Sequence, residues 1–436
     1  MIAYFRETCS AMGLNGPESV GLVIGTVVTV LLAVFYSYQY VYLLISCFLR
    51  PKRYPKTDRT KRYAAIIAAR NEECVLPSLV RSIRAQDYPR DLIDIYVVAD
   101  NCTDGTAAAA RAEGAVVFER ADKTRVGKGF ALGFLFDRIA EQKGSLRAYD
   151  AYLVFDADNV LRPDYFSHMD RAFCAGNRIL TSYRNSKNYG KNWISAGYAL
   201  WYLHESRHLN NARSLLGCSA AISGTGFLVD SAIIERNGGW GHTLLTEDIE
   251  FTVDSILQGE RVGYCHAAEL FDEQPETFSH SVRQRKRWAK GFFQVFHKYG
   301  GRLARRIFLP SWSSFDMMMN LMPAFLLSAL QLLCSAALLF VDLILYGRLS
   351  LYLLSGLFAF FGFGYLLIFI FGLFALVSER RRIHCSKLRA FLLLFTFPIF
   401  MITYLPISIS ALFSHVEWQP TPHKYALDSD QIETRG

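Results

Sequence analysis

The sequence has little charge and lacks the glycine-rich motifs of the common nucleotide-binding folds. Only 20% of its 436 residues are charged, whereas 52% are hydrophobic, which is an apolar composition for a soluble enzyme. Neither a G-x-G-x-x-G string nor a G-x-x-x-x-G-K-[ST] string occurs, and Gly127-Lys128-Gly129 is only a glycine-rich turn with a lysine. The hypotheses of a dinucleotide-binding domain and of a P-loop NTPase therefore lack the motifs that would support them.

Cysteine pairs with metal or redox spacing are also missing. The nine cysteines are an odd number and are scattered without any C-x-x-C pair. This pattern argues against a disulfide framework and against a cysteine-based zinc site. It fits reduced cysteines in a domain that faces the cytosol.

The net charge of +8 does not point to nucleic acid, because the basic residues gather at the ends of apolar segments. This distribution is the positive-inside pattern of membrane proteins. One cluster follows the first apolar segment and consists of Arg50, Lys52, Arg53, Lys56, Arg59, Lys61 and Arg62. Another precedes or begins the last segment and consists of Arg380, Arg381, Arg382, Lys387 and Arg389. The sequence therefore predicts the lipid bilayer, and no nucleic acid, as a partner.

Four apolar runs, residues 20–49, 321–346, 350–377 and 388–413, are long enough to cross the roughly 30 Å hydrocarbon core of a bilayer. The first run is too long for a cleaved signal peptide and its basic cluster follows it, so we expect a retained anchor. Residues 1–19 would lie outside and the central domain in the cytosol of a multi-pass plasma-membrane protein. The last run contains Pro398 and Pro406, so it either spans the membrane or is kinked and partly re-entrant.

Residues 50–280 form the predicted soluble domain. Strand-like stretches at 63–68, 93–99, 115–119 and 151–155 alternate with helix-like stretches at 75–85, 103–113 and 130–140. Such alternation predicts a Rossmann-like, mainly parallel α/β sheet. Residues 281–320 read as amphipathic helices at the membrane surface, and residues 414–436 as a C-terminal tail.

Carboxylates follow two of the predicted strands. Asp100 and Asp156 lie at strand ends, where open α/β sheets bind ligands. Asp156 and Asp158 flank Ala157, and such a pair suits Mg²⁺ or Mn²⁺, which prefer oxygen ligands. The ion would offset the charge of a departing diphosphate. The structural alternative is a helix cap before Arg162-Pro163.

Two further groups carry candidate chemistry. Asp248, in Thr246-Glu247-Asp248, is either a general base for an acceptor hydroxyl or a capping acid at the start of a helix over residues 249–257. Gln284, Arg287 and Trp288 fall on one helical face. The tryptophan would stack on a sugar, and its neighbours would hold a hydroxyl and a phosphate. A helix lying on the membrane surface is compatible with this interpretation.

The string His204-Glu205-Ser206-Arg207-His208 is a literal H-E-x-x-H. In a zinc protease the two histidines bind the metal and the glutamate is the base. A membrane metalloprotease is therefore a rival hypothesis. It leaves every aspartate discussed above unexplained, and a polar helical segment is the structural alternative.

Taken in order, these strings resemble those of processive, membrane-embedded family 2 glycosyltransferases, the cellulose, chitin, hyaluronan and poly-N-acetylglucosamine synthases and NodC-like enzymes. The resemblance covers about residues 60–300 and the flanking apolar runs. Each string by itself occurs in many unrelated proteins, but all of them together, in this order, are specific for the family. The matching strings are Ala69–Glu73, Val98–Thr106, Gly127–Gly129, Phe155–Asp158, Ser223–Gly226, Thr246–Asp248 and Gln284–Trp288.

The resemblance implies a GT-A fold, a UDP-sugar donor with Mg²⁺ or Mn²⁺, and inversion at the anomeric carbon with Asp248 as the base. The metal would lie at Asp156 and Asp158. By the same analogy the donor site would comprise Ala69, Glu72, Asp100, Lys128, Asp156, Gln284 and Arg287. The acceptor site would comprise Ser223, Gly224, Thr225, Glu247 and Trp288. The segment Trp418–Lys424 resembles a gating loop, with Thr421 and Lys424 as its polar residues.

The leading hypothesis is thus a synthase that extends a growing β-linked polysaccharide, a secreted or capsular polymer, and moves it across the membrane. UDP-glucose is favoured over UDP-N-acetylglucosamine, because the Ser223–Gly226 loop differs from the acceptor loop of chitin and hyaluronan synthases. The predicted apolar helices are few for a polysaccharide channel, so we expect a homo-oligomer or export partners to complete it. The alternatives are a non-processive transferase onto a lipid carrier and, more remotely, the metalloprotease.

Overall fold

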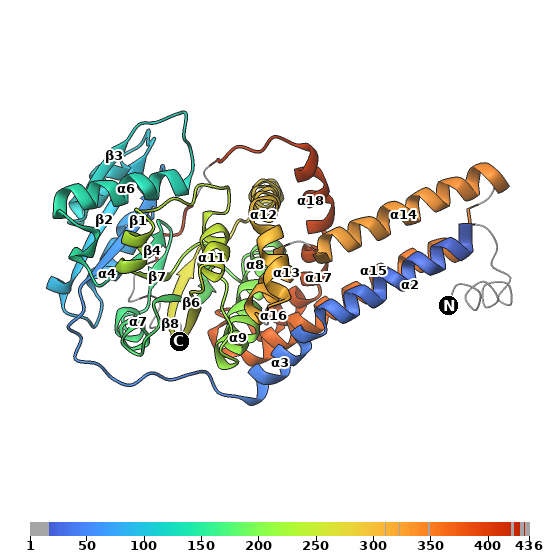
Figure 1. Ribbon diagram of the computed structural model, residues 1–436, viewed down its shortest axis with the longest axis horizontal. Helices are drawn as coiled ribbons and strands as arrows, with labels where there is room; N and C mark the ends of the chain where they lie inside the picture. The colour runs from blue at the N-terminus through green and yellow to red at the C-terminus, as the bar shows by residue number, and fades with distance from the viewer. Residues whose placement is uncertain are drawn as a thin grey trace.

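The computed structural model describes residues 17–309, 311–321, 323–347, 349–419, 423–427 and 431. Within these residues an eight-stranded sheet has the order β3-β2-β1-β4-β7-β6-β8-β5 (Figure 1). The strands are β1 (Tyr63–Ala69), β2 (Ile93–Asp100), β3 (Val116–Arg120), β4 (Ala151–Asp156), β5 (Val160–Leu161), β6 (Ile179–Ser186), β7 (Phe227–Asp230) and β8 (Val262–Asp272).

The first half of the sheet is parallel, and its register brings the predicted donor residues together. β1 pairs in parallel with β2 and β4, and β2 with β3. Ala69 pairs with Ala99, one residue before Asp100, while Ala68 pairs with Asp156. The two carboxylates therefore flank the end of β1 at one edge of the sheet, as strand ends do in open α/β folds.

The second half of the sheet is mixed. β7 is antiparallel to β4 and β6, β6 is parallel to β8, and β5 is antiparallel to β8. The predicted mainly parallel α/β sheet is confirmed. The antiparallel strand β7 follows the Ser223–Gly226 loop directly, so it aims that loop at the end of β4.

Alternate residues of β1 point to opposite faces of the sheet, as strand geometry requires. Ile66 packs on one face against α6 and α8, and Ile67 on the other against α4 and α7. The helices of the domain are α4 (Leu76–Arg84), α5 (Thr106–Ala112), α6 (Lys128–Lys143), α7 (Tyr165–Cys174), α8 (Trp193–His204), α9 (Asn211–Leu215), α10 (Ser231–Arg236) and α11 (Glu247–Leu257). Short 3-10 turns lie at Arg90–Leu92 and Leu146–Ala148, and a π-helix spans Glu205–Asn210.

Four stretches among the described residues are long and apolar enough to cross a membrane: Glu18–Phe48, Trp312–Tyr346, Leu351–Ser378 and Lys387–Phe413. The first comprises α2 (Pro17–Tyr36) and α3 (Tyr38–Phe48), which are separated only by Ser37, a residue with helical φ and ψ. It corresponds to the helix expected over residues 20–49. Figure 1 shows α2, α14 (Pro323–Tyr346) and α15 (Leu351–Ser378) projecting together away from the sheet.

The last apolar run leaves the sheet domain and returns to it. It consists of α16 (Lys387–Leu394), α17 (Phe397–Ile402) and α18 (Tyr404–Phe413). Before it, in the 3-10 turn Arg380–Arg382, Arg382 pairs with Glu269 of β8 at 3.2 Å. After it, His423 contacts Glu72 beside β1. Both ends of the run therefore contact the same domain, while the run itself is long and apolar enough to cross a membrane.

Helix α12 (Phe278–Ile307) joins this run to the domain. Its Arg285 is fully buried and donates from Nη1 to the Phe400 carbonyl at 2.9 Å and to Thr403 Oγ1 at 2.8 Å. A guanidinium at the last carbonyls of α17 complements the negative end of that helix. The break between α17 and α18 is therefore capped from α12.

A buried ion pair fixes the apolar N-terminal helix to the domain. Arg213 of α9 and Asp316 of α13 (Trp312–Leu321) are each 2% exposed, with Nε and Oδ2 at 2.7 Å. Tyr38 and Tyr42 of α3 donate their hydroxyls to the same carboxylate at 3.0 and 2.9 Å. Three separate segments thus share one satisfied polar centre, which is the condition under which a buried charge pair is tolerated.

Candidate active site

The residues predicted to bind the donor lie at and just after the ends of β1 and β2. Asp100 is buried, and its Oδ1 accepts from Arg120 Nη1 at 2.6 Å. Asn71, between Ala69 and Glu72, has a φ of +58°, so the chain turns sharply after β1 and points Glu72 back to the sheet edge. Ala69, Glu72 and Asp100 all line one cavity, as predicted for a nucleoside site.

Lys128 links residues predicted for the donor with residues predicted for the acceptor. Its Nζ donates to Asp156 Oδ1 at 2.5 Å and to the Gly224 carbonyl at 2.6 Å, and lies 3.7 Å from Glu247 Oε1. Helix α6 begins here because Gly127, with a φ of +141°, turns the chain in a conformation that favours glycine. Although burial lowers it, the neighbouring carboxylates raise the pKa of Lys128, so the ammonium stays charged.

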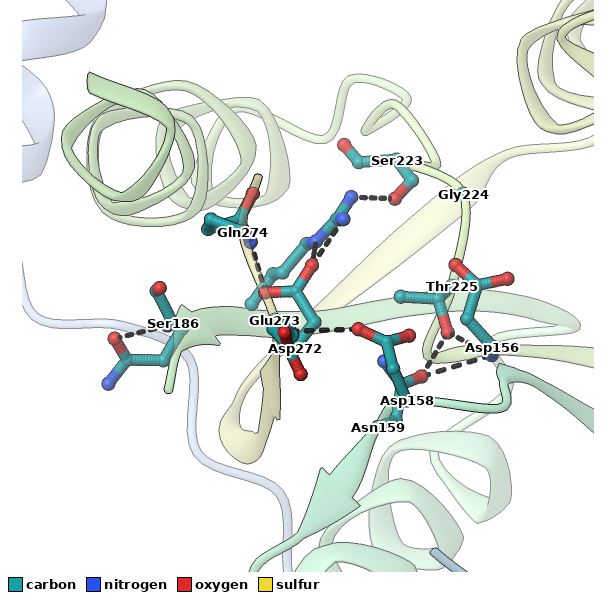
Figure 2. Close-up of polar contacts among 12 residues, drawn as sticks. Asp156, Asp158, Asn159, Ser186, Ser223, Gly224, Thr225, Asp272, Glu273 and Gln274 are labelled. Carbon is teal, nitrogen blue, oxygen red and sulfur yellow. Dashed lines mark hydrogen bonds and ion pairs between the residues drawn. The ribbon is translucent and has the colours of Figure 1, made fainter. Parts of the chain in front are cut away.

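Asp158 lies deeper than Asp156. Its Oδ2 accepts from the Glu273 backbone N–H at 2.8 Å (Figure 2), and Lys187 Nζ bonds its carbonyl oxygen. Against the effect of burial, the cations of His423 and Lys187 lower the pKa of Asp158. The carboxylate is therefore ionised and has lone pairs left for a cation.

A divalent ion at Asp156 and Asp158 would need help from the substrate. Among the described residues no group of three or more His, Cys, Asp or Glu side chains could hold a metal ion. The two carboxylates offer hard oxygen ligands of the type that Mg²⁺ and Mn²⁺ prefer. They fit an ion whose other ligands are diphosphate oxygens and water.

Asp248 and Glu247 open α11 on the opposite wall. Burial raises the pKa of the Asp248 carboxyl. Burial and the charge of Asp248 raise the pKa of Glu247 to about 7, against the lowering effect of Lys128. A buried carboxylate with increased proton affinity is suited to accept a proton from a hydroxyl. The assignment of Asp248 as the general base stays a prediction, and the raised pKa is consistent with it.

The Ser223–Gly226 loop passes between these two walls. A Cβ built on Gly224 would lie 3.8 Å from Asp156 Oδ2 and 3.9 Å from Asp248 Oδ2, and Gly224 has a φ of +81°. Thr225 turns away, because its hydroxyl accepts from the Asp156 N–H at 2.9 Å and bonds Asn159 (Figure 2). Thr225, predicted for the acceptor, instead shapes the turn that carries Asp156.

Gln284, Arg287 and Trp288 reach the cavity from one face of α12, as predicted. Arg287 donates to the Leu245 carbonyl at 3.0 Å, and Trp288 meets Tyr198 edge to face at 5.7 Å. The helix approaches so closely because residue 291 is glycine. A Cβ there would lie 2.5 Å from the side chain of Thr246.

Sequence reasoning missed several polar residues of the site. Arg184 pairs with Asp272 through Nε at 2.6 Å and donates from Nη1 to the Ser223 carbonyl at 2.5 Å. Glu205 accepts from Ser223 Oγ at 2.5 Å. Asp272 ends β8, so the strand-end argument applied to Asp100 and Asp156 would have found it. Arg184 gave no sequence signal of its own, and Glu205 was noted only as the glutamate of the H-E-x-x-H string.

The C-terminal tail covers the donor half. His423 Nδ1 lies 2.9 Å from Glu72 Oε1, and the backbone N–H of Lys424 donates to Glu273 at 3.0 Å. Trp418 stacks on the guanidinium of Arg70 at 5.2 Å. Trp418 and His423 line the cavity, whereas Lys424 does not. Thr421 lies outside the described residues.

The H-E-x-x-H string does not form a metal site among the described residues. His208 bonds Ser46 Oγ of α3 at 2.6 Å and Ser378 Oγ of α15 at 3.1 Å. His204 is 2% exposed and packs against Phe371 and Trp201. The histidines therefore hold the apolar helices against the domain, and the metalloprotease hypothesis has no support in this segment.

The cavity that joins these residues has a volume of about 1000 Å³. Of the residues predicted from the sequence, thirteen line it: Ala69, Glu72, Asp100, Lys128, Asp156, Asp158, Ser223, Gly224, Glu247, Asp248, Gln284, Arg287 and Trp288. It continues past Trp288 between the apolar helices. The residues predicted for the donor and those predicted for the acceptor thus share one cavity, which continues between the apolar helices.

A model described as "Glycosyltransferase like family 2" matches residues 61–291, more than half of the chain. The chain therefore belongs to this glycosyltransferase family, and it is an enzyme. The matched range runs from β1 to the face of α12 that carries Trp288.

Three curated proteins show what the chain is similar to. The probable glycosyltransferase YdaM of Bacillus subtilis (strain 168) is 28% identical over 57% of this chain and 59% of its own. A beta-monoglucosyldiacylglycerol synthase of Synechocystis sp. is 26% identical over 54% and 48%. A poly-beta-1,6-N-acetyl-D-glucosamine synthase of Staphylococcus aureus (strain MW2) is 22% identical over 55% and 56%. The chain spans about half to three fifths of the length of these relatives.

Among solved structures, the mannosyltransferase PcManGT from Pyrobaculum calidifontis, in complex with GDP-Man and Mn²⁺, aligns with a TM-score of 0.53 at 17% identity. The alignment covers 89% of this chain and 99% of that one. At this identity the likeness shows a shared fold and no more.

Proposed function

We propose that the chain is an inverting glycosyltransferase that moves a sugar from a UDP-sugar to an acceptor hydroxyl presented from the membrane. One observation carries the proposal. The carboxylates of Asp156, at the end of β4, and Asp248, at the start of α11, both lie within 4 Å of where the Cβ of Gly224 would be. A sugar held at Gly224 would have the diphosphate on one side and a base on the other, the in-line geometry that inversion requires.

On the donor side, Glu72 and Asp100 would contact the uridine and Lys128 the diphosphate, as the family resemblance implies. Arg287 and Gln284 would approach the same phosphates from α12. UDP-glucose is the first donor to test and UDP-N-acetylglucosamine the second.

Asp158 and Asp156 would hold Mg²⁺ or Mn²⁺ together with the diphosphate. When bound, the ion would neutralise charge on the departing UDP. Lys128, already 2.5 Å from Asp156, would add a fixed positive charge there. The side chains of the protein would supply the other catalytic groups.

The transfer step is a single displacement. Asp248 accepts the proton of the acceptor hydroxyl while that oxygen forms a bond to the anomeric carbon. The bond from this carbon to the diphosphate oxygen breaks on the opposite face, and UDP leaves with the electron pair. The configuration is inverted and no covalent enzyme intermediate forms.

Two acceptor classes compete for this site. The family resemblance favours a growing polysaccharide that is also moved through the membrane. A membrane lipid is the second. The relatives do not choose between them, because a poly-N-acetylglucosamine synthase and a monoglucosyldiacylglycerol synthase are both similar to the chain.

The segment from Trp418 to Lys424 would act as the gate over the donor, as expected from its resemblance to a gating loop. Its contacts to Arg70, Glu72 and Glu273 support this role. The expected contributions of Thr421 and the Lys424 side chain remain part of the proposal.

The test is UDP release from a panel of UDP-sugars by membranes that contain the full chain, with and without Mn²⁺ or Mg²⁺. We expect release from at least one donor, dependent on the ion, and its loss in Asp248→Asn with nucleotide binding retained. Near-normal turnover of Asp248→Asn would refute the assignment of the base.

A further inference from the structure

A basic surface without acidic partners lies where the chain leaves α3. Lys52, which follows Phe48 closely, and Arg261, between α11 and β8, are both exposed. Partial burial of its ammonium and the nearby charge of Arg261 lower the pKa of Lys52, so the two cations are neighbours. Among the described residues neither of them pairs with a carboxylate, and the hydrogen bond of Arg261 goes from Nη1 to the Gly217 carbonyl at 3.5 Å.

The acid next to Arg261 is engaged by other arginines. The carboxylate of Glu260 accepts from Arg178 at 2.8 Å and from Arg236 at 2.7 Å. Lys52 and Arg261 therefore repel each other with no described carboxylate between them. A bound anion would replace this repulsion by attraction to both cations. The pair is thus a candidate anion site.

Apolar side chains border the two cations. Leu216, next to Gly217, is 49% exposed, and Trp312, the first residue of α13, is 45% exposed. The turn that carries Leu216 meets the start of α13, because Ser313 Oγ accepts from the Ser219 N–H at 2.9 Å. One surface therefore combines unpaired cations with exposed apolar groups, a combination typical of proteins that bind a lipid surface.

This surface lies at the end of an apolar stretch. Val41, Leu44 and Phe48 follow one face of α3 and are 52%, 55% and 82% exposed. Their exposure continues to the last residue of the stretch Glu18–Phe48, which is long and apolar enough to cross a membrane. Lys52 would therefore lie at the level of the lipid head groups, where basic residues meet anionic lipids.

Trp312 lies close to the same stretch. Its indole N–H donates to the Tyr42 hydroxyl of α3 at 2.6 Å, so the start of α13 is held against α3. Tryptophan is enriched where a protein passes from head groups to hydrocarbon. A free phosphate ion would leave the exposed apolar neighbours uncovered, whereas a phospholipid would cover them with its acyl chains.

We propose that Lys52 and Arg261 bind the phosphate of an anionic phospholipid in the leaflet that adjoins the domain, and that Leu216 and Trp312 contact its acyl chains. The lipid lies at the junction of α3, α13 and the turn at residues 216–219. This site is separate from the cavity that contains Asp248, since none of these four residues lines that cavity. The inference therefore goes beyond the proposed transfer reaction. It makes the lipid composition of the bilayer a determinant of how firmly the domain is attached.

The indole of Trp312 provides the measurement. The full chain is placed in phosphatidylcholine nanodiscs that contain, at one mole fraction, either brominated phosphatidylcholine or brominated phosphatidylglycerol. Bromine quenches tryptophan fluorescence only at close range. Because the chain has six tryptophans, the Trp312→Phe variant supplies the signal to subtract. We expect the anionic lipid to quench Trp312 more strongly than the neutral lipid, because it is enriched beside Lys52 and Arg261.

Matched variants locate the site. Neutralising one basic residue at a membrane surface should weaken the binding of an anionic lipid about fivefold. Lys52→Gln and Arg261→Gln should therefore each lose most of the excess quenching. Arg90→Gln and Lys123→Gln remove the same charge from exposed positions elsewhere on the sheet domain and should retain the excess. Sodium chloride should reduce the excess in the parent, since salt screens exposed charges.

Four results would overturn the proposal. They are equal quenching by the two brominated lipids, no quenching by either, and an excess that persists in both Lys52→Gln and Arg261→Gln. The fourth is displacement by inorganic phosphate beyond that caused by sodium chloride of equal ionic strength, which would indicate a site for the free ion. None of these measurements requires sugar transfer, so each of these results would leave the proposed function untouched.

Discussion

The imidazole of His423 lies 2.9 Å from the carboxylate of Glu72, although 351 positions separate the two residues in the sequence. Burial lowers the pKa of His423, but Asp158, Glu72 and Glu273 together raise it to about 10. The side chain is therefore a cation at neutral pH. The tail thus places a positive charge among the acids that would otherwise face the donor.

Loss of this contact should free the tail. We predict that His423→Ala exposes the segment to chymotrypsin and changes the KM for the UDP-sugar severalfold, because the Glu72 carboxylate loses its partner. Lys424→Ala is the control, since its described contact to Glu273 uses the backbone N–H. Equal cleavage rates in both variants and the parent would show that His423 does not hold the tail.

The pH dependence of transfer should report the acids of α11. A base must be deprotonated to act, so kcat/KM should fall as the pH drops through the pKa of the pair. Glu247, with a pKa of about 7, titrates jointly with Asp248. In Glu247→Gln the neighbouring negative charge is gone, which lowers the pKa of Asp248. The acidic limb should then move to lower pH, and an unmoved limb would contradict the coupling.

The approach of α12 to the base should depend on Gly291. Gly291→Ala puts a methyl group 2.5 Å from Thr246, and such overpacking costs about 1–3 kcal/mol. We expect a lower Tm and a lower kcat, because Arg287 and Trp288 move away from Asp248. Gly301→Ala, on the same helix with nothing within 4 Å of the new Cβ, should keep both values or raise the Tm slightly.

The buried centre at Asp316 should be a stability element. Asp316→Ala leaves the Arg213 guanidinium, 2% exposed, without its counter-charge, and such a loss costs about 3–5 kcal/mol. Thermal unfolding in detergent would measure it. A variant that loses both charges, Arg213→Met with Asp316→Leu, should recover part of the loss, and failure to recover any would argue that the tyrosines dominate.

Metal dependence should centre on Asp158. We predict that EDTA abolishes UDP release and that Asp158→Asn raises the Mn²⁺ concentration for half-maximal rate by about tenfold or more, since a neutral amide is a weaker ligand than a carboxylate. Asp164→Asn, at the partly exposed start of α7, is the control. An unchanged Mn²⁺ requirement in Asp158→Asn would remove this residue from the ion.

Much of the fold and most of the site could be predicted because each signal was local. Alternating apolar runs identified β1, β2 and β4, and strand ends identified Asp100 and Asp156. Residues whose role depends on long-range packing were missed. Arg184 pairs with Asp272, which is 88 residues away in the sequence. His423 contacts Glu72, which is 351 residues away. The hydrogen bond of the Thr225 hydroxyl to the Asp156 N–H could not be predicted, because it depends on the pairing of β7 with β4.

The broken run at α17 and α18 has one more consequence. Arg285 fastens α12 to this run at the Phe400 carbonyl, and α12 also carries Trp288 beside the base. These hydrogen bonds from Arg285 therefore fix the position of Trp288 relative to α17 and α18.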